Sequence, residues 1–435
     1  MYAIDNWISI FIWTVFFGLL LYIGVKKIAV GGIIDPIHFA YTFTMGTTYA
    51  VIFSLYFSGF ISNYLFFMIV LFGLVFYGSL IYFSKKKQKF VNRLFSLIVP
   101  KNNSHFEFKV IFIIYTLIAL FIISQIGFGF FAATNRFDNN KGFGAFVRIT
   151  DVLGTFIIAY LSVVYYKRYK NIGINDLKQY FKYFLLLVFI IFFTILNGAK
   201  AAFIFSLMTI ILAIRASGNK FKIGVFQGTI ILTIATTFVV LGLYINLQKN
   251  NMDVSGGGEH IKGIPIVAEK FIHRIIANGN QSYMSLPNNV IEHVKTDNII
   301  IRLFTPIIGT SLMSKIVGYP ANNYSVGRQI ILYYAPNMDV AGGPTSHFDL
   351  FSYVYFGFGG VFFIFILGYI LGSINKILTQ ASDKSVFYVA LVSTLWVRSV
   401  AIILEPVTGL AYVFDVFIIF ILLKLLIYIL NIAVK

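Results

Sequence analysis

Long runs of hydrophobic residues, separated by short polar connections, dominate this sequence. Several runs reach the roughly 20 residues that a helix rising about 1.5 Å per residue needs to cross a hydrocarbon core about 30 Å thick. The runs lack the alternation of apolar and polar residues that is typical of membrane β-strands, so helices are the expected way to satisfy their backbone groups. Eleven spans are predicted, over residues 7–25, 35–58, 61–83, 109–132, 147–166, 183–197, 199–216, 223–246, 348–373, 386–404 and 411–431.

The composition supports this prediction. Hydrophobic residues make up 59% of the 435 positions and charged residues only 11%, whereas charged residues are about 25% of a typical soluble domain. Cysteine is absent, which excludes disulfides and thiolate metal sites. No basic residue precedes the first run at Trp7, so no cleavable signal is expected. The predicted fold class is an all-α polytopic integral membrane protein with about eleven transmembrane helices.

The basic residues predict the orientation of the spans. The net charge is +18, and much of it falls in short connections at 26–27, 85–93, 167–170 and 215–222 that alternate with connections lacking such clusters. Basic connections face the cytoplasm. This places the N-terminus outside and the C-terminus in the cytoplasm. Because the charges are divided among several small connections, a nucleic-acid partner is not expected.

One long connection separates two membrane regions, so the chain has three regions. It contains residues of both charge signs, and its apolar segment 299–320 is interrupted by Arg302, Pro306, Gly309 and Lys315. We expect an interfacial or re-entrant segment there. The alternative is a twelfth span, which would move the C-terminus to the outside. The predicted regions are an eight-helix membrane region at 1–246, a large periplasmic connection at 247–347 and a three-helix membrane region at 348–435.

Charged residues within the predicted spans gather in the outer half of the membrane. Arg398 lies about six residues, or about 9 Å, below the outer end of its helix, and Glu405 follows seven residues later on the same helical face. The other members of this group are Arg148, Asp151, Lys200 and Asp415. Ionisable side chains inside a membrane normally mark functional sites. The structural alternative is that Arg398 pairs with Glu405 or Asp415 while the others cap helices. Lys424 lies toward the inner end, and we expect it to snorkel.

The sequence SHFD places His347 and Asp349 where the large connection enters the ninth span. A histidine whose tautomer is fixed by a carboxylate is a general-base candidate. The alternative is an interfacial hydrogen bond between the two. No HExxH sequence or close histidine pair suggests a metal site.

A cavity lined by arginine and lysine in the outer leaflet suits a lipid-linked phosphate or pyrophosphate, since the guanidinium fork pairs with phosphate oxygens. Further candidates for this role are Arg136, Arg274 and Arg328. Amides that bind hydroxyls and aromatic rings that stack on sugars suit a glycan. Candidates for glycan binding are Asn322, Tyr324 and Tyr334, although tyrosines also form interfacial belts.

Three segments, NGAKAAFIF, FIHRIIANGNQSYMSL and GGPTSHFDLFSYVYFGFGGVFFIFILGYILG, together with the many spans and the single large late connection, resemble the bacterial O-antigen polymerases. The resemblance implies a GT-C-like glycosyltransferase that joins oligosaccharide repeat units carried on undecaprenyl pyrophosphate, in the periplasm and without a metal or other cofactor. It also implies roles for periplasmic arginines, here Arg136 and Arg274. The turn that commonly holds an arginine in such enzymes has Lys200.

The resulting hypothesis is that Arg398 and Lys200, with Arg274 and Arg136 or Arg328, hold the donor pyrophosphate. A base drawn from His347, Asp349 or Glu405 would accept the proton of the acceptor hydroxyl. The expected partners are lipid-linked donor and acceptor, membrane lipid and a chain-length regulator. The alternatives are a flippase or exporter of the same lipid, an O-antigen ligase and an O-acyltransferase.

Overall fold

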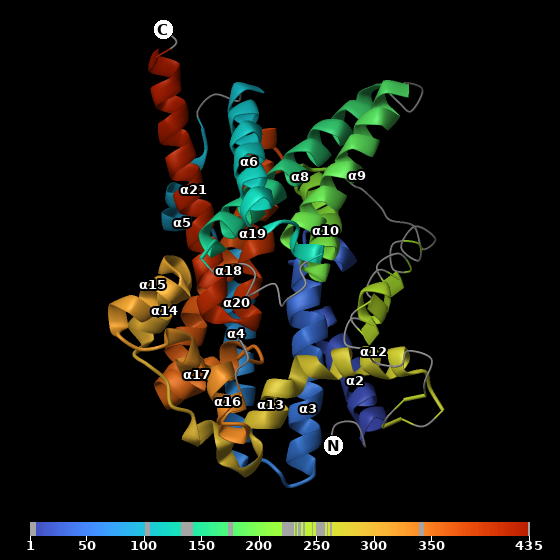
Figure 1. Cartoon of the computed structure of the whole chain (residues 1–435), viewed down its shortest axis with the longest axis vertical. Helices are drawn as coiled ribbons and strands as arrows, with labels where there is room; N and C mark the ends of the chain where they lie inside the picture. The colour runs from blue at the N-terminus through green and yellow to red at the C-terminus, as the bar shows by residue number, and fades with distance from the viewer. Residues whose placement is uncertain are drawn as a thin grey trace.

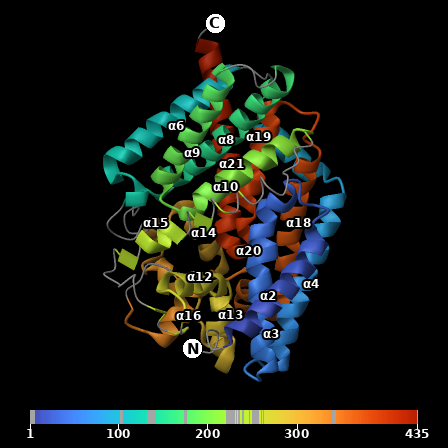
Figure 2. The same ribbon diagram turned by 90° about the vertical axis from the view of Figure 1, so that its right-hand side faces the viewer.

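The computed structural model describes residues 6–100, 105–131, 142–172, 177–219, 257–338 without 259 and 262, and 343–433, with isolated positions between 230 and 248. The structure is 83% helical, and no strand occurs in the described ranges. Helices α2, α3 and α4 line one side of the molecule, and the short helices of the large connection gather at one end (Figures 1 and 2). The N-terminus lies at that end and the C-terminus at the opposite end.

Eight helical segments in the described residues are long and apolar enough to cross a membrane. They are Trp7–Val25 (α2), Asn63–Lys85 (α4), Phe106–Ile126 in α6 (His105–Ile126), Gly144–Lys170 in α8 (Gly144–Ile172), Tyr180–Asn197 in α9 (Leu177–Asn197), Phe348–Thr379, Val386–Leu404, and Pro406–Ile432 in α21 (Pro406–Ala433). The prediction of a polytopic helical membrane protein is therefore confirmed. Of the eleven predicted spans, eight are thus supported in the described residues.

The predicted second span, 35–58, is not one regular helix. It consists of a π-helix, His38–Met45 (η2), followed by the α-helix Gly46–Phe57 (α3). Within η2 the hydroxyl of Thr44 donates to the carbonyl oxygen of Phe39, five residues earlier, at 3.0 Å, which matches the wider π-helical turn. Such irregular turns often occur at functional sites.

Two other predicted segments also differ. Residues 199–216 form Lys200–Ala216 (α10), at 17 residues a helix shorter than the eight above. Segment 299–320 forms two short helices, Ile299–Ile308 (α14) and Thr310–Val317 (α15), separated by Gly309 at a φ of 99°. Neither is long enough to span, which argues against a twelfth span here. Most of the predicted span 223–246 lies outside the described residues.

The C-terminal region is interrupted twice. Phe348–Phe356 (α17) and Gly360–Thr379 (α18) are separated by a 3-10 turn at Gly357–Gly359 (η7). Val386–Ser399 (α19) and Ala401–Leu404 (α20) end at Glu405, which is extended. Proline disfavours helical geometry in the residue before it and suits the first turn of the next helix. Pro406 therefore starts α21 ahead of the predicted start at residue 411.

Helix α19 lies at the centre of the packing, because 78% of the span Val386–Leu404 is buried compared with 17% of α2. Helix α18 packs closely along α4. A Cβ atom on Gly368 would lie 1.8 Å from the hydroxyl oxygen of Ser79, so this contact requires glycine. The remaining helices of the large connection are Ile266–Ile276 (α12), Asn280–Ser285 (α13) and Val326–Tyr334 (α16).

Candidate functional site

Four of the predicted charged residues meet where α8, α19 and α21 pack together. Arg398 Nη1 lies 3.5 Å from Asp151 Oδ2, and Arg148 Nε lies 3.4 Å from Asp415 Oδ2. The guanidinium of Arg398 also lies 3.8 Å from the centre of the Tyr412 ring, a cation–π contact. We call Arg148, Asp151, Arg398 and Asp415 the paired group. Its two positive and two negative charges balance.

The counter-charge of Arg398 is therefore within the protein. The ion pair of Arg398 is with Asp151. Of the two predicted partners, Asp415 pairs with Arg148 but also interacts with the Arg398 charge, whereas Glu405 bonds to Ser346. The expectation that Glu405 shares a helical face with Arg398 fails because the helix ends before Pro406. Arg398 nevertheless keeps two buried nitrogens, Nε and Nη2, without a hydrogen-bond partner.

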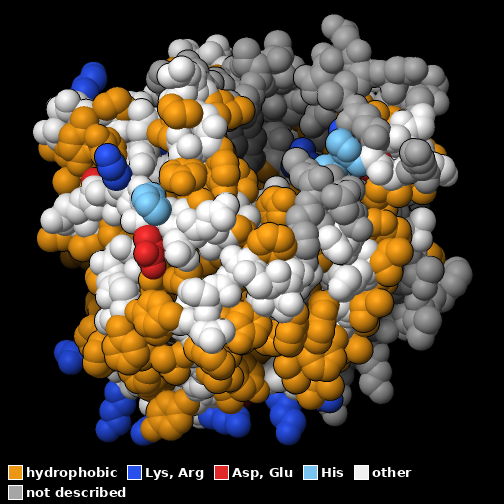
Figure 3. All heavy atoms as spheres, turned by 90° about the horizontal axis from the view of Figure 1, so that it is seen from below, with side chains coloured by type: hydrophobic (Ala, Val, Ile, Leu, Met, Phe, Trp, Pro, Cys, Tyr) orange, Lys and Arg blue, Asp and Glu red, His pale blue; other side chains and the backbone are white. Residues whose placement is uncertain are grey.

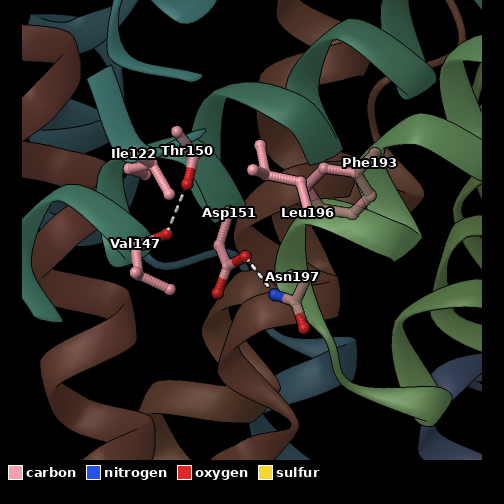
Figure 4. A pocket seen from close by; sticks show the side chains of 7 residues that line it. All are labelled: Ile122, Val147, Thr150, Asp151, Phe193, Leu196 and Asn197. Atoms are coloured by element: carbon pink, nitrogen blue, oxygen red, sulfur yellow. Dashed lines mark hydrogen bonds between the residues drawn. The ribbon is translucent and has the colours of Figure 1, made fainter. Parts of the chain in front are cut away.

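The turn before Lys200 is attached to the paired group. Asn197 Nδ2 donates to Asp151 Oδ1 (Figure 4), and Asn197 Oδ1 accepts from the backbone N–H of Ala199 at 3.0 Å. Lys200 begins α10 directly after this turn, but its side chain lies outside the described part of the chain.

A small pocket opens beside Asp151 and Asn197 (Figure 4). Its cavity volume of about 10 Å³ is close to the minimum for one water molecule. The other lining residues are Ile122, Val147, Thr150, Phe193 and Leu196. The pocket is too small for a diphosphate or a sugar.

A second polar region lies where the large connection enters α17. The carboxylate of Glu405 accepts hydrogen bonds from the Ser346 backbone N–H at 2.9 Å and from the Ser346 hydroxyl at 3.0 Å. The backbone N–H of His347 donates to Leu404 O at 2.9 Å. These bonds hold the end of the connection against the break between α20 and α21.

His347 and Asp349 are both fully buried but do not pair. The Nδ1 atom of His347 lies 3.3 Å from the hydroxyl oxygen of Thr48 on α3, whereas Asp349 Oδ1 accepts from the backbone N–H of Leu350 at 2.8 Å. His347 Nε2 and Asp349 Oδ2 have no hydrogen-bond partner. His347 also has a φ of 47°, a strained value for a non-glycine residue that often occurs at active sites.

Burial shifts the pKa values of His347 and Glu405, two of the three predicted bases, in opposite directions. It lowers the pKa of His347 to about 3, so this histidine is neutral and a weak base near pH 7. Burial raises the pKa of Glu405, against the opposing effects of the Ser346 hydrogen bonds and the Arg302 charge. A carboxylate must be ionised to act as a general base, and the Ser346 hydrogen bonds and the Arg302 charge favour the ionised form of Glu405.

Arg328 on α16 is the least compensated cation of this region. It is 5% exposed, and its Nη2 atom donates to Met338 O at 2.5 Å. Its Nε and Nη1 atoms have no partner, and no described carboxylate lies within ion-pairing distance. The backbone beside it touches the segment before Ser346, since a Cβ on Gly327 would lie 1.8 Å from Pro344 O.

Helix α13 brings further polar side chains that the sequence analysis did not identify. Gln281, Ser282 and Ser285 are buried, and their side-chain oxygen and nitrogen atoms have no hydrogen-bond partner. The helix packs against α3 and α16. Thr48 on α3 also donates to Asn278 O at 3.1 Å. Gln281, Ser282 and Ser285 are uncharged residues on a short helix. The hydrophobic periodicity of the sequence therefore did not reveal them.

We call the second region the outer junction. Its members are Thr48, Gln281, Ser282, Ser285, Arg328, Ser346, His347, Asp349 and Glu405. Nearly all buried polar groups in proteins have a hydrogen-bond partner, so this concentration of unpaired atoms indicates a place for water or a polar ligand. The outer junction and the paired group are connected through α14, whose Ile307 O accepts from Arg148 Nη2 at 2.8 Å and whose Arg302 is near Glu405.

Arg302 makes structural contacts with Asp297 and with the backbone of Ala321. Its Nη2 atom lies 2.6 Å from Asp297 Oδ2 and 2.7 Å from Ala321 O, and its Nε atom lies 3.1 Å from Asp297 Oδ1. This two-point ion pair holds α14 against the turn that precedes α16.

The remaining predicted residues are dispersed. Arg274 is exposed on α12, and Arg136 lies outside the described residues. Tyr334 is 52% exposed, and its hydroxyl donates to Met284 O at 2.8 Å. Asn322 and Tyr324 are half-buried in a 3-10 turn, where the Tyr324 ring packs edge-on against Tyr319.

The end of the molecule that carries the large connection shows few basic side chains in its described part (Figure 3). In the described part of the end seen in Figure 3, basic side chains are scattered among hydrophobic and uncharged ones. Among the described residues, no group of three or more histidine and acidic residues could hold a metal ion. No protein-family model, no curated protein and no solved structure matches this chain.

Proposed function

We propose that this protein is a membrane-embedded glycosyltransferase that polymerises oligosaccharide repeat units carried on undecaprenyl pyrophosphate, at the periplasmic face of a bacterial inner membrane. The observation that supports this most is the buried Arg328 without a counter-charge in its described surroundings. An isolated buried charge is costly, and a diphosphate would supply both its missing charge and its missing hydrogen bonds.

In the proposed reaction Arg328 binds the donor diphosphate and stabilises the charge that develops as it leaves. The bond between the sugar anomeric carbon and the diphosphate oxygen breaks while the acceptor hydroxyl oxygen bonds to the same carbon. The electron pair of the broken bond leaves with the diphosphate. Stabilising such a leaving charge in a site that excludes water is a major source of catalysis.

Glu405 is the proposed general base. It accepts the proton of the acceptor hydroxyl, and its contacts with Ser346 and the charge of Arg302 favour the ionised form that this role needs. Ser346 orients its carboxylate through two hydrogen bonds. His347, which is neutral near pH 7, positions the end of the connection through Thr48 and Leu404.

The paired group has a supporting role in this proposal. Arg398 retains two unpaired nitrogens and could donate to a second diphosphate oxygen, but its charge is already balanced by Asp151. Lys200 follows the turn attached to the same carboxylate. A GT-C-like fold remains a prediction of the resemblance alone.

The proposal is tested by glycan chain length in a strain that lacks the gene and carries E405Q in its place. Removing a general base typically lowers the rate by about 10²- to 10⁴-fold, so long chains should disappear while single repeat units persist at normal protein level. The matched control is E292Q, which changes an exposed glutamate of the same connection and should leave chain length normal.

A transport defect would give a different result. If the deletion strain loses all transfer of repeat units to the outer leaflet, and purified protein moves the lipid across vesicle membranes, then the protein is a flippase and the proposal is wrong. Normal long chains in E405Q would remove Glu405 from the mechanism.

A further inference from the structure

Helix Lys89–Ile98 (α5) lies between α4 and α6 in the chain and packs against α21 (Figure 1). It follows the last residue of α4 after a short turn, and its Phe95 ring lies 5.0 Å from the Tyr388 ring near the start of α19. The outer junction lies beyond the other end of α19. Helix α5 is thus next to the ends of two membrane-spanning helices, and it plays no part in the proposed reaction.

One stripe of α5 packs against the protein. Val91, Phe95 and Ile98 recur at a spacing of four and three residues, which places them on one helical face. Phe95 and Ile98 are each 1% exposed. The C-terminal carbonyls of the helix are capped by Lys424 of α21, whose Nζ donates to Leu97 O at 2.6 Å and to Val99 O at 3.2 Å. The orientation of α5 is therefore fixed.

The neighbouring stripe of α5 is hydrophobic and exposed. Phe90, Leu94 and Leu97 have the same spacing and are 66%, 37% and 55% exposed. A helix whose apolar face lies open beside spanning helices is typical of segments that lie in the plane of the membrane interface.

The third face of α5 and the turn before it are basic. Five cations, Lys85, Lys86, Lys87, Lys89 and Arg93, are exposed, and no acidic residue occurs between positions 85 and 106. Lys86 contacts only the hydroxyl and ring of Tyr82 within the described structure. Clusters of this kind beside a membrane helix bind anionic lipid headgroups.

We propose that α5 and the preceding turn form a binding site for anionic phospholipids. Phe90, Leu94 and Leu97 insert among the acyl chains, while the five cations contact the headgroup phosphates. Positive residues that only set topology would not require an adjacent open hydrophobic stripe or a helix held in place by a capping lysine. The site is independent of the proposed glycosyltransferase activity.

The absence of cysteine makes insertion directly measurable. The full chain carrying L94C or S96C is labelled with a fluorophore and reconstituted into vesicles of phosphatidylcholine with about a quarter phosphatidylglycerol. Ser96 is on the polar face, so its label should be quenched by aqueous iodide. The Leu94 label should instead be quenched at least about threefold more by lipids carrying a spin label near the carbonyl. Equal quenching of both positions by iodide would overturn insertion.

Headgroup binding is measured separately, by counting phosphatidylglycerol and phosphatidylcholine molecules that remain on the purified protein in native mass spectrometry. K86Q/K87Q/K89Q/R93Q should reduce the preference for phosphatidylglycerol by at least about tenfold. K167Q/R168Q/K170Q removes three charges from a connection of the same predicted orientation and should leave the preference unchanged. Added inorganic phosphate should not displace the lipid. Unchanged preference in the first variant, or equal loss in both, would overturn the proposal.

Discussion

Arg398 and Arg328 are both buried arginines, but their surroundings differ. Arg398 lies in a group whose two positive and two negative charges balance, and its ring contact with Tyr412 adds support. Arg328 donates a hydrogen bond to one backbone carbonyl, and no described carboxylate lies within ion-pairing distance of it. Burying a charge without a partner lowers stability, so a cation retained in that state is better explained by a ligand than by folding. We therefore propose that Arg398 acts mainly in structure and that Arg328 binds a ligand.

The largest effect on stability is expected in the paired group. R398M should lower the free energy of unfolding by about 3–5 kcal/mol, because it leaves Asp151 buried without its cation. The double variant R398M/D151N should recover much of this loss. R328M removes a charge that no described carboxylate compensates, so its stability should stay within about 1 kcal/mol of wild type.

These values can be measured by unfolding in mixed detergent micelles. Equal losses in R398M and R328M would contradict the assignment, because they would show that both arginines are needed for folding. No recovery in R398M/D151N would mean that the contact between Arg398 and Asp151 contributes little.

A smaller effect is expected from His347 when the pH changes. Its folded pKa of about 3 is below the unfolded value of about 6.5. As the pH falls below 6.5, the unfolded state therefore binds a proton that the folded state does not. Between pH 7 and pH 5 this should lower the free energy of unfolding by about 2 kcal/mol.

The variant H347Q should lack this part of the acid sensitivity, whereas H293Q, which changes an exposed histidine of the same connection, should retain it. The measurement is the unfolding midpoint at several pH values. If H347Q and wild type lose stability equally on acidification, then His347 is accessible to protons in the folded protein and its assigned role needs revision.

The sequence predicted the fold class well, because hydrophobic length depends on the membrane thickness and is visible in each segment separately. It was less successful where local chemistry breaks a helix. Gly309 was recognised as an interruption, but the end of α20 before Pro406 and the π-helix at His38–Met45 were not predicted. The π-helical turn includes a hydrogen bond from the Thr44 hydroxyl to the Phe39 carbonyl. The hydrophobic pattern of the sequence does not show which carbonyl a threonine hydroxyl will contact.

The site was predictable only as a set of residue types. The outer location of the charges follows from their positions in each span, but the pairing of Arg398 with Asp151 depends on how α8 packs against α19. Glu405 was predicted to lie on the same helical face as Arg398. This was wrong, because helix α20 ends before Pro406 and Glu405 is extended. Gln281, Ser282 and Ser285 could not be distinguished from ordinary polar residues of a connection until α13 was seen to pack against α3.

The central claim is tested most directly by measuring the binding of a fluorescent polyprenyl diphosphate to the purified protein and its Arg328 variants. R328M should bind at least about tenfold more weakly than wild type, and R328K should recover part of the affinity because a lysine lacks the guanidinium fork. K295A, which changes an exposed lysine of the same connection, should bind like wild type. If R328M binds the diphosphate with wild-type affinity, then the buried arginine is not the binding group and the account is contradicted.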